Sequence, residues 1–109
     1  MTLPVVICDD SGVAQKQMAR SLPDSWDVDI SFAKHGLEAL EQVNQGKGDV
    51  LFLDLNMPVM DGYQTLQKIA EQDLNTVVIV VSGDIQPDAR KRVMALGAVD
   101  FIKKPFQKD

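Results

Sequence analysis

Short apolar runs alternate with longer amphipathic segments along the whole chain, and this alternation restricts the possible folds more than any other feature. Five runs have the length and composition of strands, at residues 3–8, 27–33, 50–53, 76–82 and 99–103. The first, third and fourth are continuous and rich in β-branched residues, which is typical of strands buried on both faces of a parallel sheet. Residues 27–33 instead alternate apolar and polar side chains, which predicts an edge strand with one wet face.

Helical periodicity fills the segments between these runs. Apolar residues recur three or four positions apart, at Ala14, Met18 and Leu22, at Leu37 and Leu40, at Leu66, Ile69 and Ala70, and at Ala89, Val93 and Leu96. Asp61 is a predicted helix N-cap, Pro87 suits a first helical turn, and Gly97 a helix end. Repeated strand–helix units predict right-handed βαβ connections and a parallel α/β sandwich.

Length, charge and cysteine content exclude several classes of protein. A chain of 109 residues is one domain, and its net charge of −5 argues against a nucleic-acid-binding surface. The single cysteine, Cys8, cannot form an internal disulfide, which favours a reducing compartment, and its apolar surroundings predict an inert core residue. No apolar run approaches the length of a membrane span, so we expect a cytoplasmic domain without membrane contact.

Polar residues follow several of the predicted strands directly. In parallel α/β sheets, ligands bind at the carboxyl ends of the strands. The residues at these ends are Asp9 and Asp10 after the first run, Asp54 and Asn56 after the third, Ser82, Gly83 and Asp84 at the fourth, and Lys103 and Lys104 at the fifth. One edge should therefore hold three carboxylates (Asp9, Asp10 and Asp54), the Ser82 hydroxyl and the Lys104 ammonium group.

Clustered carboxylates need a cationic partner. Two like charges about 4 Å apart repel by roughly 4 kcal/mol at an effective dielectric of about 20. Mg²⁺ is the natural partner, because it prefers oxygen ligands and is held in proteins by one or two carboxylates. Lys104 can neutralise the remaining charge and is expected close to Asp54. His35, the only histidine, lies in a polar stretch and is predicted on the surface.

The segments VVICDDS, DLNMPVMDG, VVSGD and FIKKPF resemble, in this order, the receiver domain of two-component response regulators. The resemblance covers essentially the whole chain and implies a flavodoxin-like (βα)₅ sandwich with a parallel sheet in the order 2-1-3-4-5, as in chemotaxis regulators. Only residues 104–109 follow the last predicted strand. We therefore expect residues 1–109 to be a receiver domain that ends before its fifth helix. It is then either the N-terminal module of a longer regulator or a trimmed single-domain protein, with an uncovered sheet face that promotes self-association, for example as a homodimer.

The resemblance also implies a role for each residue at the sheet edge. Asp54 corresponds to the aspartate that accepts a phosphoryl group from the phosphohistidine of a sensor histidine kinase or histidine phosphotransfer protein. Asp10 corresponds to a direct Mg²⁺ ligand and Asp9 to one that acts through water. Asp54 and the backbone carbonyl of Asn56 complete the protein ligands.

Three further residues match catalytic or switch positions of the family. Ser82 corresponds to the hydroxyl that bonds a phosphoryl oxygen, where Thr is commoner, and Lys104 to the lysine that pairs with another oxygen. Phe101 corresponds to the aromatic rotamer switch, in place of the frequent Tyr. Asn56 and Asp84 occupy positions that help to set how fast the phosphoryl group is lost. The implied protein is a regulator of an output domain or downstream partner, and it catalyses only its own phosphorylation and dephosphorylation.

Three other functions are compatible with parts of the sequence. A haloacid-dehalogenase-type phosphatase needs a second acid two residues after the nucleophile, where this chain has Asn56. A flavodoxin-like electron carrier needs a hydroxyl- and glycine-rich loop after the first strand, where Asp9 and Asp10 would repel the phosphate. A receiver-like interaction module that is never phosphorylated is the third.

Overall fold

Strands and helices alternate along the part of the chain that the computed structural model describes, residues 2–83 and 87–104. Within these ranges the elements are β1 (Leu3–Cys8), α1 (Gly12–Ser21), β2 (Val28–Ala33), α2 (Gly36–Asn44), β3 (Val50–Leu53), α3 (Gly62–Glu71), β4 (Val77–Ser82), α4 (Pro87–Ala95) and β5 (Asp100–Lys103). Each strand begins within one residue of its predicted start and ends at its predicted end. No described helix combines the length and apolar character that crossing a membrane requires.

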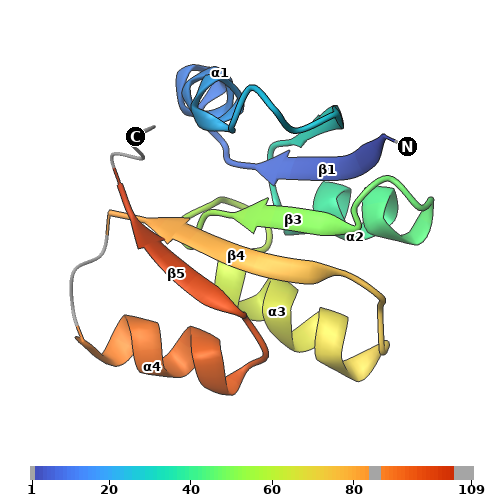
Figure 1. Cartoon of the computed structure of the whole chain (residues 1–109). Helices are drawn as coiled ribbons and strands as arrows, with labels where there is room; N and C mark the ends of the chain where they lie inside the picture. The colour runs from blue at the N-terminus through green and yellow to red at the C-terminus, as the bar shows by residue number, and fades with distance from the viewer. Residues whose placement is uncertain (1, 84–86, 105–109) are drawn as a thin grey trace.

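The strands form one parallel sheet in the order β2-β1-β3-β4-β5 (Figure 1). Val5 of β1 pairs with Ile30 of β2 on one side and with Val50 of β3 on the other. The chain thus runs outward from β1 in both directions, and the loops after β1 and β3 leave the sheet side by side at its carboxyl edge. The predicted strand order is confirmed, as is the edge position of the strand predicted at residues 27–33, which is β2.

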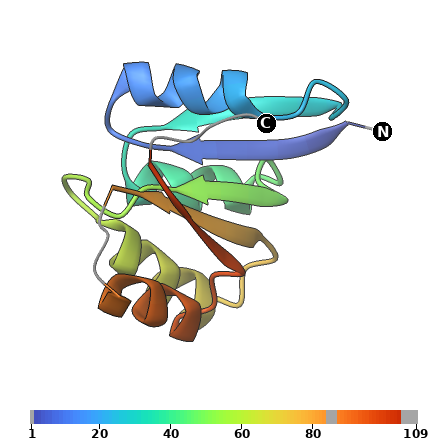
Figure 2. The ribbon, with the colours of Figure 1, turned by 60° about the vertical axis from the view of Figure 1, so that its left-hand side comes forward.

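The helices cover the two faces of the sheet unequally. Figures 1 and 2 show α1 on one face and α2, α3 and α4 on the other. The larger core lies under these three helices, and the smaller one joins Met18 and Leu22 to Val5, Ile7 and Phe52 of the sheet. The predicted end of the chain before a fifth helix concerns residues 105–109, which lie outside the described residues.

Local signals in the sequence define the helix ends. Asp61 accepts a hydrogen bond from the Gln64 N–H at 2.9 Å and Gln64 returns one to the Asp61 N–H at 3.0 Å, which forms a capping box at the start of α3. α4 begins at Pro87, and Gly97 follows its end with a φ of +111°. The predicted cap, first-turn proline and helix stop are therefore confirmed.

The predicted buried faces of three helices need correction. Leu37 is 49% exposed, Ala70 is exposed and Ala14 is only half-buried. The buried positions are instead Gln15 and Met18 in α1, Ala39, Leu40 and Val43 in α2, and Thr65, Leu66 and Ile69 in α3. A strict spacing of four drifts off one face of a helix with 3.6 residues per turn, which explains the error in α1.

His35 is half-buried instead of exposed. It is the N-cap of α2, and its Nδ1 accepts a hydrogen bond from the Glu38 N–H at 3.4 Å. The capping role holds the imidazole against the helix end, so the prediction of a surface histidine was wrong in this respect. Nothing in this position brings the imidazole into the acidic cluster, which consists of Asp9, Asp10 and Asp54 among the described residues.

Candidate functional site

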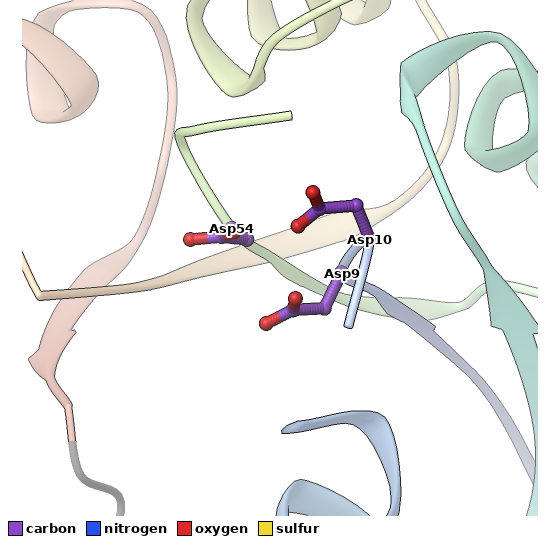
Figure 3. Close-up of side chains that lie close together, drawn as sticks. All are labelled: Asp9, Asp10 and Asp54. Carbon is purple, nitrogen blue, oxygen red and sulfur yellow. The ribbon is translucent and has the colours of Figure 1, made fainter. Parts of the chain in front are cut away.

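Three carboxylates gather at the carboxyl edge of the sheet. Asp9 and Asp10 directly follow β1, and Asp54 directly follows the neighbouring β3. One oxygen of each lies within 4.8 Å of the others, and Figure 3 shows the three side chains side by side. Asp9 and Asp54 are buried, while Asp10 is exposed. The predicted convergence of the three carboxylates is therefore confirmed, and their chemical roles remain predictions.

Backbone hydrogen bonds hold two of these residues in place. The Asp54 N–H donates to the Cys8 carbonyl at 3.0 Å, and the Asp9 N–H donates to the Ala33 carbonyl at 2.9 Å. The side chains are fixed as well, since Asp9 Oδ1 accepts the Ser11 N–H and Asp54 Oδ1 accepts the Leu55 N–H, both at 2.9 Å. The site is thus built into the ends of adjacent strands.

The loop after Asp54 folds back tightly against the strand end. The Gly62 N–H donates to the Leu55 carbonyl at 2.9 Å. A Cβ atom at Gly62 would lie 2.5 Å from the Asp54 carbonyl oxygen and 2.8 Å from Leu55 Cα, so this position requires glycine.

Lys104 supplies the positive charge beside the cluster. Its Nζ lies 2.7 Å from Asp9 Oδ2 and 3.3 Å from Asp54 Oδ1. Its backbone N–H donates to the Ser82 carbonyl at 2.8 Å, which fixes the segment after β5 against the end of β4. The expected proximity of Lys104 to Asp54 is confirmed, and the contact with Asp9 is the shorter of the two.

Burial and neighbouring charges change two pKa values at the site, and the pKa values of both Asp54 and Lys104 are raised. Burial and the neighbouring Asp9 charge raise the pKa of Asp54, although Lys104 and the Leu55 N–H act in the opposite direction. For Lys104, burial alone would lower the pKa, but the hydrogen bond to Asp9 and the charges of Asp54 and Asp9 outweigh it and raise the pKa. Removing the ammonium charge would therefore be unfavourable while the carboxylates are ionised.

Cys8 immediately precedes Asp9 in the chain and is buried. Its side chain is 1% exposed, and its Sγ lies 3.3 Å from the Met57 Sδ. Burial, followed by the charges of Asp9 and Asp54, raises the pKa of the thiol to about 12. The predicted burial of Cys8 in the core is confirmed, and a thiol with so high a pKa has little thiolate character at neutral pH.

The donor set fits a hard divalent cation. With the single ammonium of Lys104, the three carboxylates carry two net negative charges, and all three donors are oxygens. Mg²⁺ prefers such oxygens and accepts one or two carboxylates together with water or phosphate oxygens. The residues at the end of β1 and β3 are therefore chemically suited to this ion.

Comparison with known proteins identifies the family of the chain. The family model for the response regulator receiver domain matches residues 5–109. The chain belongs to this receiver domain family. The CheY chemotaxis protein of Listeria monocytogenes is 35% identical over 107 residues, which cover 98% of this chain and 90% of that protein.

Other relatives are much longer than this receiver domain. A protein-glutamate methylesterase/protein-glutamine glutaminase of Geobacter sulfurreducens is 37% identical over 102 residues, which cover 93% of this chain and 27% of that protein. The chain spans less than a third of the length of several methylesterases of this kind, with shares of 27%, 30% and 29%. The similarity therefore concerns one part of those proteins.

Solved receiver structures share the fold. The response regulator domain of Thermotoga maritima CheB superposes with a TM-score of 0.85 at 32% identity, covering 98% of this chain and 81% of that chain. The receiver domain of NarL from Mycobacterium tuberculosis gives a TM-score of 0.86 at 30% identity, covering 95% of this chain and 85% of that chain. The flavodoxin-like receiver fold implied by the resemblance is thereby confirmed.

Three other predicted site residues lie within the described part of the chain, at the same edge or in the core beneath it. Ser82 is fully buried as the last residue of β4. Phe101 is half-buried on β5, opposite Val80, and packs against the larger core. Asn56 is exposed in the loop after Asp54. Asp84 lies outside the described residues, and the roles of all four remain predictions.

Sequence reasoning missed one polar residue at the site, Gln15 of α1. It is 7% exposed, and its Nε2 donates to the carbonyls of Asp9 at 2.8 Å and Ala33 at 3.1 Å. A signal was available, because Gln15 has the helical spacing that places it on the same face as Met18 and Leu22. A polar residue at a core-facing helix position must find hydrogen-bond partners inside the protein.

Proposed function

We propose that this receiver domain is a phosphorylation-dependent signalling switch in which Asp54 accepts a phosphoryl group. The observation that carries the proposal is the cluster of Asp9, Asp10 and Asp54, with carboxylate oxygens within 4.8 Å of one another and Lys104 paired to two of them. A site of this kind serves phosphoryl transfer by positioning and neutralising charge, with a carboxylate as the covalent nucleophile.

The transfer conserves atoms and charge in a simple way. An Asp54 carboxylate oxygen forms a bond to the phosphorus of a donor phosphohistidine while the phosphorus–nitrogen bond breaks. The leaving imidazole keeps the electron pair and takes a proton from water. Asp54 Oδ1 already accepts the Leu55 N–H at 2.9 Å and lies near Lys104, so we assign the attack to Oδ2.

Asp10 and Asp54 would hold Mg²⁺ directly, Asp9 would act through water, and the Asn56 carbonyl would complete the protein ligands. When bound, the ion neutralises charge on the transferring phosphoryl group. Lys104 Nζ lies 3.3 Å from Asp54 Oδ1, which supports a role in which its ammonium would pair with a phosphoryl oxygen on that residue. This pairing would stabilise the phosphorylated state.

Ser82 and Phe101 would convert phosphorylation into a change of shape. Ser82 ends the strand next to Asp54 and its carbonyl is tied to the Lys104 N–H, so the hydroxyl and the ammonium belong to one connected edge. A shift of Ser82 toward the phosphoryl group would allow Phe101 to turn further inward. The surface formed by α4 and β5 would then differ between the two states.

The partners follow from the same reaction. The donor would be a sensor histidine kinase or a histidine phosphotransfer protein, and the altered surface would act on an output domain or downstream protein in the cytoplasm. The domain would catalyse only its own phosphorylation and dephosphorylation. The methylesterase named for the longer relatives is an activity of those proteins, and we do not assign it to this receiver domain.

The decisive experiment is phosphorylation with acetyl phosphate and Mg²⁺. We expect the wild-type domain to gain one phosphoryl group by intact-mass spectrometry, and Asp54→Asn to gain none. Asp61→Asn is a matched control, because Asp61 caps α3 in the loop after Asp54, and Asn is an equally good N-cap.

Two outcomes would contradict the proposal. Full labelling of Asp54→Asn would remove Asp54 from its role. No labelling of the wild type, together with no response of its amide NMR signals to beryllofluoride and Mg²⁺, would favour the interaction module that is never phosphorylated.

A further inference from the structure

The acidic cluster is supported from behind by a buried glutamine. Gln15 of α1 is 7% exposed and faces the sheet together with Met18. Its Nε2 donates to the Asp9 carbonyl at 2.8 Å and to the Ala33 carbonyl at 3.1 Å. One amide group therefore ties α1 to the carboxyl ends of both β1 and β2.

This amide completes the set of hydrogen bonds around Asp9. The Asp9 N–H donates to the same Ala33 carbonyl at 2.9 Å, and Asp9 Oδ1 accepts the Ser11 N–H at 2.9 Å. The Asp9 carbonyl belongs to the planar peptide unit that leads to Asp10. The Gln15 amide therefore donates to the peptide unit that joins the two carboxylate-bearing residues.

We propose that Gln15 is a positioning residue, whose side-chain amide orients the Asp9–Asp10 peptide and so holds the two carboxylates at the spacing that cation binding needs. The inference rests on the proposed function for the identity of the cation, Mg²⁺. Outer-shell groups of this type typically change metal affinity by about 10–100-fold when they are removed.

The chemical type of the side chain suits this role. A glutamine donates two hydrogen bonds without adding charge, so the two net negative charges of the cluster with Lys104 are preserved for a divalent cation. A lysine or arginine here would add a positive charge close to the cation. An apolar residue would leave the Asp9 carbonyl without its Gln15 donor in a buried environment, which is unfavourable.

The test compares Gln15→Met with Gln42→Met. Both variants keep the length of the side chain and remove an amide that donates to β2, since Gln42 Nε2 donates to the Phe32 carbonyl at 2.8 Å. Phe32 immediately precedes Ala33, but Gln42 belongs to α2 and its hydrogen bond does not involve Asp9. The pair thus separates the contact with Asp9 from the general loss of a glutamine hydrogen bond to β2.

Two readouts are measured on the intact chain. Mg²⁺ affinity is obtained from the amide NMR shifts of Asp10 and Asp54 during titration with MgCl₂, and we expect about tenfold weaker binding for Gln15→Met and no change for Gln42→Met. In metal-free protein, we expect hydrogen exchange of the Asp9 N–H to accelerate more than that of Val6 in Gln15→Met only. Gln15→Asn, which is too short to reach both carbonyls, repeats the test should Gln15→Met not fold.

The proposal would be overturned if the Gln15 variants bound Mg²⁺ as tightly as wild type and hydrogen exchange accelerated equally at Asp9 and Val6. Gln15 would then be a structural residue only. A wild-type domain that binds no Mg²⁺ would instead contradict the proposed function. In that case the exchange of the Asp9 amide alone decides whether Gln15 positions the peptide.

Discussion

At the scale of single residues, Lys104 is the group that makes the acidic cluster compatible with a folded chain. It contacts Asp9 at 2.7 Å and Asp54 at 3.3 Å, and both carboxylates are buried. Burial and Asp9 raise the pKa of Asp54, which means that ionised Asp54 lowers the stability of the native state. The lysine offsets this unfavourable term, and its own raised pKa reflects the same attraction.

Lys104→Met should therefore destabilise the domain by about 2 kcal/mol at pH 7, since it leaves two buried carboxylates without their ammonium partner. This value is below the range for fully buried pairs, because the Lys104 side chain is 30% exposed and partly screened by solvent. The pKa of the Asp54 carboxyl group is raised in the folded state. Such a group stabilises the native state at low pH, where it is protonated, and this stabilisation is lost as pH rises through the folded-state pKa. The difference from wild type should therefore shrink toward pH 4, as measured by urea unfolding.

The neighbouring Lys103 provides the control for this measurement. Lys103 is exposed at the end of β5, so Lys103→Met removes the same charge and side-chain length without touching the cluster. We expect its stability to remain close to wild type at both pH values. Equal destabilisation by the two variants would show that net charge, and not the pairing with Asp9 and Asp54, determines the effect.

Gly62 shows a steric requirement at the same scale. A methyl group there would lie within 2.8 Å of backbone atoms of Asp54 and Leu55, which cannot move without displacing the strand end. We expect Gly62→Ala to lower the free energy of unfolding by about 1–3 kcal/mol. Gly12→Ala is the control, because a Cβ atom at Gly12 has no neighbour within 4 Å, and it should be neutral or slightly stabilising in urea unfolding. Similar effects of both changes would contradict this explanation.

At the scale of elements, the loop between β3 and α3 contains backbone strain beside the site. Val59 has a φ of +67°, and the Met60 N–H donates to the Pro58 carbonyl at 2.7 Å, which together describe a tight γ-turn. A positive φ is unusual for a β-branched residue. The Met60 carbonyl also accepts the Gly36 N–H at 3.1 Å, so the start of α2 holds the turn in place.

Val59→Asn should relieve this strain and stabilise the domain by about 1 kcal/mol, because Asn tolerates a positive φ and Val59 is 71% exposed. Val13→Asn is the matched control, since Val13 is 76% exposed in α1 and asparagine is no better than valine within a helix. Thermal unfolding should show a higher Tm for Val59→Asn alone. A gain in both variants would indicate a general benefit of removing exposed valines.

At the scale of the whole molecule, the parallel sheet concentrates negative charge at one edge, and stability and function oppose each other there. Lys104 pairs with two of the three carboxylates at the ends of two adjacent strands, and the repulsion among the three is unfavourable. Functional sites are where buried, like-charged groups of this kind typically cluster. A cation that binds only the native state would raise the free energy of unfolding and so offset the repulsion among the carboxylates.

Asp10→Asn should make the domain more stable without Mg²⁺ and reduce the stability that it gains from Mg²⁺. Without Mg²⁺ we expect the variant to be more stable than wild type by about 1 kcal/mol, since one of the clustered charges is removed at an exposed position. With Mg²⁺ at about 100 times its dissociation constant, wild type should gain about 2.7 kcal/mol and the variant clearly less. Asp29→Asn, at an exposed position on β2, should change neither value. Urea unfolding with and without MgCl₂ measures all three proteins.

The sequence by itself determined the elements and their order, because strand runs, helix periodicity and caps such as Asp61 are local signals. The burial of Cys8 and the presence of an acidic edge followed from the same patterns and from the rule that parallel strands end together. Only the tertiary structure decided which carboxylate Lys104 approaches more closely, that Gln15 supports Asp9, and that Gly62 touches the Asp54 carbonyl. These contacts join residues that are far apart in the chain or whose spacing carries no helical or strand signal. Their distances depend on how α1, β3 and β5 pack, and local sequence patterns do not specify that packing.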